Sequence, residues 1–553
     1  MDRNNITINK ISTRNLIRRI DEGRFAIPKL QREFVWDGPK AAKLLDSMYA
    51  GMPIGVVMVW QTPKAQRLYL RQKYHVLPPF NDRNPKVWFL IDGQQRVSVI
   101  HHVREGSSLR NARRKEIDFS RVVLSLEKQD DGQQIRYRKP IPGLYESLSD
   151  VLHPQWHNRL SHLTQRQKKH VELCRQQIFN YRIHLMFIRT DIDQIRESFL
   201  RINTQGMKVT TADAIFTKAE NLDLRDIHHE VLQHLDDAFA EIGEMPILFA
   251  MSAVRGASEA RGEALRQVIH RLEREAKEDR RLRRSLTNDW HKLSRCFGKA
   301  VDFMRQNFKV LNRDFLYSDY MVSMVALFYY WNGRGPGARQ KEQINKWFWA
   351  TSVGSRYTGR NFLVCLPSDL KFFKKLARNS NMRFTYRPQV ERVDLRKAQY
   401  ASRAGITSAF YCLLLKRGPV SIMDGGINEI PLERYATNAN RKDRHHIFPQ
   451  RAARAADIPA NLYNSVCNVC VLTAEENQQI GFRRPRLYLA DVQNSGSHFK
   501  KKMARHFIPV EDDSGIWTRN LKRGFHLFLK CRAEHLSRAL ETEAGTRLFR
   551  RDL

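Results

Sequence analysis

The chain has 553 residues, 42% of them hydrophobic and 28% charged, so it should hold about two to four folded domains and is too apolar for wholesale disorder. Its 95 lysines and arginines outnumber 58 aspartates and glutamates, and the formal charge of +37 favours a polyanionic partner such as nucleic acid. We find no signal core at the N-terminus, the longest apolar run (320–331) is too short to span a bilayer, and the scattered cysteines suit a reducing cytoplasm. These features argue against a membrane or secreted protein.

The N-terminal third carries strand and helix signals on either side of a glycine turn. Residues 56–60 (VVMVW) and 87–91 (VWFLI) are short apolar runs typical of strands, and a helical pattern covers 97–103. Between the second run and the helix lies DGQQR at 92–96. Such a turn is a natural anion site, because helix-terminal amides donate to the ligand and arginine can hold a phosphate with two hydrogen bonds. The alternative is a structural strand-to-helix turn without a ligand.

Two further motifs flank this turn. Upstream, IPKLQREFVW at 27–36 contains Gln31 and Arg32 and is followed by a helical run through Met48. Downstream, the sequence at 199–206 is FLRINTQG. The set QR…W, DGQQR and FxxxNxxG resembles the N-terminal domain of the GmrSD-type, modification-dependent (type IV) restriction enzymes.

This resemblance implies a ParB/sulfiredoxin-like fold whose glycine-to-arginine turn handles the phosphates of a nucleotide triphosphate. By motif position, it assigns to the nucleotide site Gln31, Arg32, Asp92, Gly93, Gln94, Gln95, Arg96 and Asn203. Arg32 and Arg96 would pair with phosphate oxygens. Asp92 would bind a cation-bound water or brace the turn, and Gln94 or Gln95 would position a water or pin the loop backbone. Nucleotide binding is better founded than hydrolysis, because the chain has no Walker A lysine motif.

The middle of the chain is expected to be helical. Helix-forming patterns cover 257–284, 288–310 and 317–331. These helices would either hold a sensor and a nuclease apart or complete the cores of the flanking domains. We expect the aromatic residues of this region to be core rather than platforms for stacked bases, namely Trp347, Phe348, Trp349 and Tyr357.

The segment DRHHIFP at 443–449 carries the clearest chemistry of the chain. One imidazole at the end of a strand can hold a divalent cation against a scissile phosphate, and a turn would let its neighbour converge on the same phosphodiester. The second imidazole, neutral near its ordinary pKa, can take a proton from water. The alternative is a strand end with two satisfied histidines.

Downstream residues complete the pattern. Asn468 opens a predicted strand, and 473–476 (TAEE) is a capping box that begins a helix containing Asn477, whose carbonyl oxygen suits a hard cation. This order resembles the HNH, or His-Me finger, nucleases. The resemblance makes His445 and Asn477 the ligands of Mg²⁺ or Mn²⁺ and His446 the general base, while Asn468 orients the base or braces the loop.

Many HNH proteins also carry zinc-binding CxxC pairs. This chain has one such pair, Cys467 and Cys470, which cannot supply four ligands. We expect both to be buried strand residues.

Together these patterns predict an α+β protein with a ParB/sulfiredoxin-like domain over 1–225, a helical spacer region over 226–390 and an HNH domain over 391–553. The expected function is that of a cytoplasmic DNA endonuclease of anti-phage defence, regulated by an NTP and cutting foreign, modified duplex DNA. A homodimer would explain double-strand cutting, whereas nicking needs one chain. Weaker phosphate contacts are expected from Arg483, Arg484 and Arg486. Two alternatives stay open: a nucleotide-gated DNA-binding regulator with an inert HNH fold, and a toxin that cuts RNA or single strands.

Overall fold

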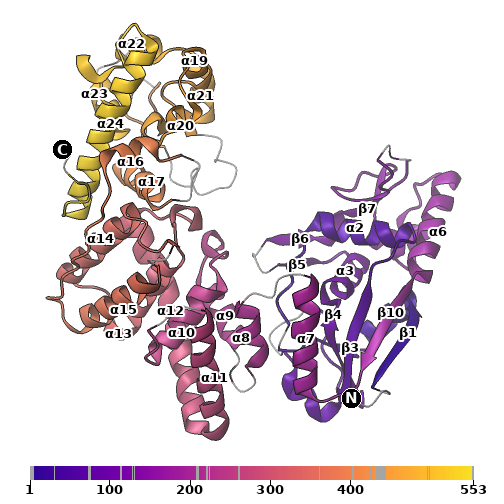
Figure 1. Ribbon diagram of the computed structural model, residues 1–553. Coiled ribbons are helices and arrows are strands. Elements are labelled where there is room, and N and C mark those ends of the chain that lie inside the picture. Colours follow the sequence, from indigo (N-terminus) through magenta and orange to yellow (C-terminus); the bar gives the residue numbers. More distant parts are fainter. Residues whose placement is uncertain are drawn as a thin grey trace. The chain divides into compact units, whose positions relative to one another are not determined.

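The computed structural model describes residues 5–29, 31–71, 76–111, 115–127, 129, 131–206, 211–219, 222, 224–258, 262–359, 362–400, 404–423, 426–430, 444–494, 496 and 498–550. The chain divides into two compact units (Figure 1). The N-terminal unit comprises Met1–Asp226 and Ile269–Arg283, and the C-terminal unit comprises Ile227–Val268 and Arg284–Leu553. The predicted domain limits near 225 and 390 stay predictions.

A mixed five-stranded sheet organises the N-terminal unit. Its order is β1 (Ile6–Ser12), β10 (Arg182–Ile188), β3 (Val56–Pro63), β4 (Lys86–Asp92) and β2 (Phe25–Ala26). The pairs β10–β3 and β4–β2 are parallel, and the pairs β1–β10 and β3–β4 are antiparallel. The strands predicted at 56–60 and 87–91 are therefore confirmed as the neighbours β3 and β4.

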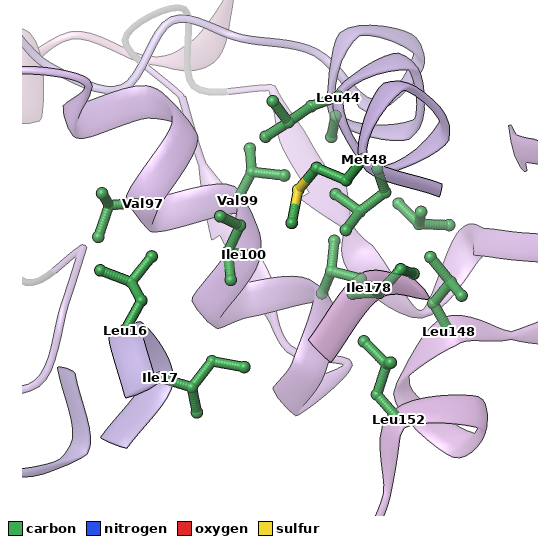
Figure 2. Close-up of a cluster of buried hydrophobic side chains, with 14 of the residues drawn as sticks. Leu16, Ile17, Leu44, Met48, Val97, Val99, Ile100, Leu148, Leu152 and Ile178 are labelled. Carbon is green, nitrogen blue, oxygen red and sulfur yellow. The ribbon is translucent and has the colours of Figure 1, made fainter. Parts of the chain in front are cut away.

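Helices cover both faces of this sheet. The larger core packs against one face, and Figure 2 shows side chains that reach it from α1 (Thr13–Asp21), α2 (Gly38–Tyr49), α3 (Gln94–Glu105), α4 (Leu148–Leu152) and α6 (Gln165–Asn180). On the opposite face, Ile195 and Phe199 of α7 (Ile192–Gly206) pack with Trp60, Phe89 and Ile188. The helix predicted at 97–103 is confirmed as part of α3.

Smaller elements complete the N-terminal unit. One small sheet pairs β5 (Ser108–Arg110) with β6 (Glu116–Asp118), and another has the order β8 (Ile135–Tyr137), β7 (Val122–Ser125) and β9 (Tyr145–Ser147). Two short helices are α5 (Trp156–Arg159) and α8 (Thr211–Lys218).

Most described residues of the C-terminal unit lie in helices. In chain order these are α9 (Leu224–His234), α10 (Glu244–Val254), α11 (Gly262–Glu278), α12 (Arg280–Phe308), α13 (Tyr320–Asn332), α14 (Ala338–Val353), α15 (Phe362–Arg378), α16 (Arg392–Lys397), α17 (Gly405–Arg417), α19 (Gln450–Ala455), α20 (Ala460–Tyr463), α21 (Ala474–Ile480), α22 (Pro485–Asn494), α23 (Phe499–Arg505) and α24 (Leu521–Ala544). Helices α9, α11 and α12 each cross a boundary between the units in sequence. Its strands β11 (Arg444–His446) and β12 (Val469–Val471) form an antiparallel pair.

One predicted helix boundary was wrong. The pattern placed a break between 284 and 288, but α12 runs through it from Arg280 to Phe308. The break comes earlier, because the carboxylate of Asp279 accepts from the amides of Arg281 (2.7 Å) and Leu282 (3.2 Å) and so caps the new helix.

The core of the C-terminal unit contains a buried polar network. Asp369 is 1% exposed and accepts hydrogen bonds from Trp347 Nε1 (3.0 Å), Tyr357 Oη (2.7 Å) and the guanidinium of Arg356 (2.9 Å). The aromatic residues at 347–349 and 357 are buried, which confirms them as core.

Helix α24 holds the C-terminal elements together. It contacts α14, α16 and α17. Its fully buried Arg532 donates to the carbonyl oxygens of Cys467 (2.9 Å), His506 (2.9 Å) and Phe507 (3.2 Å). No helix in the described part of the chain has both the length and the apolar character that a bilayer crossing requires.

Candidate functional site

Two short strands and a capped helix position the C-terminal candidate residues. In the β11–β12 pair, His445 lies opposite Cys470 and His446 lies opposite Val469. Helix α21 follows β12, and its capping box is confirmed: Thr473 Oγ1 accepts from the amide of Glu476 (3.2 Å), and Glu476 Oε2 accepts from the amide of Thr473 (3.1 Å).

The carboxylate of Glu476 also secures a distant segment. Its Oε1 atom accepts from Ser421 Oγ (2.8 Å) and from the amides of Ile422 (2.6 Å) and Met423 (2.9 Å). The first turn of α21 is therefore fixed from two sides, and Asn477 is the next residue along it.

His445 and Asn477 meet. His445 Nδ1 lies 2.5 Å from Asn477 Oδ1, and the imidazole is 3% exposed. Because an amide oxygen only accepts, Nδ1 carries the hydrogen in this contact and Nε2 keeps its lone pair. Within the described residues Nε2 has no hydrogen-bond partner. Burial lowers the pKa of His445 to about 4, so the ring is neutral at pH 7.

His446 has a different set of partners, because successive residues of a strand point to opposite faces. Its Nε2 atom lies 3.2 Å from Asn464 Oδ1 and 3.2 Å from Gln450 Nε2, and Gln450 donates to Asn464 at 3.0 Å. The ring of Tyr400 stands edge-on to the imidazole with centroids 5.1 Å apart. Burial lowers the pKa of His446 as well.

These three partners of His446 were missed in the sequence. Gln450 lies one helical turn beyond His446, which is a weak signal. Asn464 and Tyr400 come from other parts of the chain and carried no pattern that links them to the histidine pair.

Asn468 is a completely buried brace. Its Oδ1 accepts from the amide of Phe448 (2.9 Å), and its Nδ2 donates to the carbonyl oxygens of Phe448 (3.1 Å) and Tyr463 (2.8 Å). These bonds fix the chain just after β11. Of the two roles expected for Asn468, the contacts are those of a loop brace.

The donor types around His445 are ones that divalent metals accept. They are a neutral imidazole whose Nε2 keeps a lone pair and the amide oxygen of Asn477, which lies against Nδ1 of the same ring. In the described ranges no three His, Cys, Asp or Glu side chains gather as a metal cluster. Two protein donors suit Mg²⁺, which keeps several water ligands and binds phosphate oxygens.

Cys467 and Cys470 are buried free thiols, as predicted, and Cys470 lies in β12. The prediction that Cys467 is a strand residue was wrong, because it lies in the 3₁₀ turn Val466–Asn468 just before β12. Burial raises the pKa of Cys467 to about 11 and that of Cys470 to about 12. Both thiols are therefore protonated at neutral pH.

Basic side chains lie at the start of α22. Arg484 and Arg486 are exposed, whereas Arg483 is half-buried and pairs with Asp491 at 2.6 Å. Another basic residue, Arg451, was not predicted; its guanidinium lies 5.0 Å from the ring centre of Phe482. That ring is 66% exposed.

In the N-terminal unit, DGQQR forms the turn from β4 to α3. Gly93 has φ = 92°, and an added Cβ would lie 3.0 Å from Val57 Cγ2, so glycine is required there. No side chain caps the N-terminus of α3. Arg96 donates to the carbonyl oxygens of Ile54 (2.7 Å) and Val56 (3.0 Å) and to the carboxylate of Asp92 (2.7 Å).

The glutamines of these motifs bind backbone. Gln31 Nε2 donates to the carbonyl oxygens of Leu90 (3.0 Å) and Ile91 (2.5 Å). Gln95 accepts from the amides of Val35 (2.9 Å) and Trp36 (3.3 Å) and donates to Glu33 O (3.2 Å). Gln95 thus pins the loop, one of the two roles expected for it.

The remaining candidates differ in surroundings. Gln94 is 3% exposed. Arg32 is half-buried, and none of the described residues forms a hydrogen bond or ion pair with it. Asn203 belongs to α7, but its side chain lies outside the described residues.

One stretch of sequence with a known counterpart contains the glycine turn, helices α7 and α8 and every strand of the five-stranded sheet except β1. Residues 13–219 match the GmrSD restriction endonuclease, N-terminal domain. This GmrSD-type domain supports a relationship to the GmrSD-type restriction endonucleases, a family whose nuclease role implies DNA as the substrate.

The relationship to a second protein extends beyond the GmrSD-type domain. An uncharacterized protein of Methanocaldococcus jannaschii is 20% identical over 600 aligned residues, which cover 94% of this chain and 96% of that protein. The two proteins are therefore similar through both the GmrSD-type domain and the C-terminal unit.

Proposed function

We propose that the protein is a metal-dependent DNA endonuclease of anti-phage defence, in which an HNH centre around His446 cuts foreign, modified DNA under the control of the GmrSD-type domain. The observation that carries this proposal is the meeting of His445 Nδ1 and Asn477 Oδ1 beside His446. A purely structural histidine would have both ring nitrogens satisfied, whereas Nε2 of His445 is buried and has no hydrogen-bond partner among the described residues. The net charge of +37 supports a polyanionic substrate.

In this mechanism His446 is the general base. With its Nε2 hydrogen donated to Asn464, the ring keeps Nδ1 as the atom that accepts a proton from the attacking water. The lowered pKa keeps His446 neutral and ready to act at pH 7. His445 and Asn477 would hold a divalent cation, which supplies charge stabilisation to the phosphoryl oxygens and the leaving group when bound.

The GmrSD-type domain would bind the phosphates of an NTP at the first turn of α3. The uncapped helix terminus offers amide donors, and Arg32 is the arginine of the motif set whose guanidinium is not engaged by the described residues. Arg96 would act by holding the 54–56 loop against the turn, since its donors already bind two carbonyl oxygens and Asp92.

The test is the cleavage of matched unmodified and phage-type modified plasmids by purified protein. Reactions contain Mg²⁺ or Mn²⁺, with and without each NTP. His446→Ala should reduce cleavage at least about 100-fold, the usual scale for loss of a general base, while DNA affinity in EDTA stays within about twofold. His526→Ala is the matched control, because this histidine is exposed on α24.

Each outcome assigns the protein to a class. Preference for modified plasmid that depends on His446 supports restriction of modified DNA. Cleavage of RNA or single strands alone would identify a toxin-like nuclease. Full cleavage activity of His446→Ala would refute the HNH centre. NTP turnover without cleavage under any condition would refute it too and would favour a regulatory module.

A further inference from the structure

A polar hollow of about 710 Å³ lies in the C-terminal unit, away in sequence from the proposed HNH centre. The N-terminal half of α14 forms one wall, and the segment 380–387 forms another. Its charged lining residues are Arg339, Glu342, Lys346, Arg383 and Arg387.

Positive charge dominates this hollow. Four of the five charged side chains are cations, and the carboxylate of Glu342 is held by Lys346 at 2.7 Å. That hydrogen bond, with smaller help from the charge of Arg383, lowers the pKa of Glu342, whose salt bridge is with Lys346. Arg339 donates to Asn381 Oδ1 at 2.9 Å, which ties the two walls together.

The segment 383–387 presents its arginines outward. Arg383, Thr385 and Arg387 are exposed, whereas Phe384 and Tyr386 are half-buried. Such alternation is typical of extended chain, in which every second side chain points to the same side.

The inward residues anchor the segment to the core. The ring of Phe384 lies 5.0 Å from that of Phe372, and its amide donates to Gln343 Oε1 at 2.9 Å. The guanidinium of Arg356, itself held by buried Asp369, lies 4.1 Å from the ring centre of Tyr386. Arg383 and Arg387 form no ion pair within the described residues. Two cations on a fixed support are thus left to meet an external anion.

The lining of the hollow indicates which class of partner it can bind. Most lining residues are polar or charged, and its aromatic residues, Phe384 and Tyr386, are half-buried anchors of the segment; small-molecule pockets are mainly apolar, and the centres of protein interfaces are rich in exposed aromatic residues. Arginine forks match phosphate oxygens. Arg383 and Arg387 can be up to about 14 Å apart along extended chain, a span that covers several phosphates of a nucleic-acid strand.

We propose that this hollow is a second DNA-binding surface, at which Arg383 and Arg387 hold the sugar-phosphate backbone of the substrate while the HNH centre cuts. The inference rests on the proposed function for the identity of the nucleic acid. It is independent of the HNH residues, since binding at this surface requires neither metal nor His446.

The experiment measures affinity for a fluorescent DNA duplex in EDTA over a range of salt concentrations. In the full-length protein, Arg383→Ala combined with Arg387→Ala should weaken binding about tenfold at low salt. The slope of log K against log salt should fall by about 1.8, because two phosphate contacts are lost. Lys371→Ala with Lys375→Ala, two exposed cations on α15, removes equal charge and should change the slope little.

Three further measurements make the test decisive. Arg383→Lys with Arg387→Lys should retain most of the slope, and thermal unfolding should show that all variants are folded. The proposed DNA-binding surface is refuted if the salt slope of the Arg383→Ala, Arg387→Ala variant equals that of the wild type. It is also refuted if Lys371→Ala with Lys375→Ala changes the slope by the same amount. Binding of RNA, free nucleotide or an acidic protein in place of DNA overturns it too.

The same assay separates this inference from the proposed function. Suppose the slope of log K against log salt falls in the alanine double variant, but the protein cleaves no DNA under any condition. This result supports the second DNA-binding surface and refutes the nuclease. Cleavage by a protein whose DNA affinity is unchanged when Arg383 and Arg387 are replaced supports the nuclease and refutes the second DNA-binding surface.

Discussion

A single buried amide, Asn468, sets the shape of the chain beside the proposed general base. It is 0% exposed and bonds the amide and carbonyl of Phe448 and the carbonyl of Tyr463. Each of these backbone groups is cut off from water, so each needs a partner from within the protein. The residue acts through position, since its bonds go to backbone and leave none for His446.

Asn468→Ala should therefore destabilise the protein by about 2–4 kcal/mol, because buried polar groups lose their partners. Cleavage should also fall, since the loop after β11 loses its brace. Thermal unfolding and plasmid cleavage measure the two effects. Asn461→Ala, at an exposed position of α20, is the control and should change neither. Equal melting temperatures for the two variants would contradict the brace.

At the scale of elements, the β4–α3 turn depends on one glycine. Gly93 combines a left-handed backbone (φ = 92°) with close contact to Val57. Gly51 has a similar backbone (φ = 69°), but nothing lies within 4 Å of the position its Cβ would take.

We predict that alanine lowers the free energy of unfolding more at position 93 than at position 51. Gly51→Ala should cost about 1 kcal/mol for the left-handed backbone alone. Gly93→Ala should cost about 1–3 kcal/mol more, because the added methyl group also crowds Val57. Urea unfolding followed by circular dichroism compares them. Equal losses would mean that the turn relaxes around the methyl group.

Local patterns predicted the elements around both candidate sites. The apolar runs of β3 and β4, the helix after DGQQR and the capping box of α21 each depend on neighbours in sequence, and each is confirmed. The partners of Arg96 were not predictable in the same way. Its contacts with Ile54 and Val56 cross from a helix to the start of strand β3, and no motif encodes them.

The same limit applies to Asn464 and Tyr400, which reach His446 only through the folded chain. Likewise, β1 pairs with β10 from the far end of the N-terminal unit, a register that depends on which partner strand is available. Residue types predicted candidate chemistry, and tertiary packing decided which of those residues are engaged.

At the scale of the whole molecule, both units bury a neutral histidine. In the N-terminal unit His102 Nε2 donates to Val76 O (3.1 Å) and Nδ1 accepts from Ser107 Oγ (2.7 Å). In the C-terminal unit His506 Nε2 lies 2.7 Å from Val420 O. Burial is the largest cause that lowers the pKa of each to about 4.

Acid should therefore weaken both units. The unfolded chain takes up these protons near pH 6.5, and the folded chain only near pH 4. The stabilisation is complete above about pH 6.5 and falls by at most about 1.4 kcal/mol per pH unit and histidine as pH drops toward 4.

Thermal unfolding of wild type and His102→Gln between pH 7.5 and 4.5 tests the N-terminal half of this prediction. The wild-type melting temperature of that unit should fall more steeply with acid than that of the variant. His157→Gln, an exposed histidine on α5, is the control. Parallel curves for wild type and His102→Gln would exclude the linkage.

A hydrogen bond from Arg532 connects two segments of the C-terminal unit that are synthesised at different times. The carbonyl oxygen of Cys467, at the entry to β12, is satisfied by a guanidinium that the chain supplies 65 residues later. On a ribosome, the β11–β12 pair emerges long before α24 exists, and its backbone then lacks this donor. The hydrogen bond from Arg532 to Cys467 can form only after α24 has been synthesised and docked. In the proposed nuclease, the strand pair that carries both histidines would therefore be completed late, after α24 has left the ribosome.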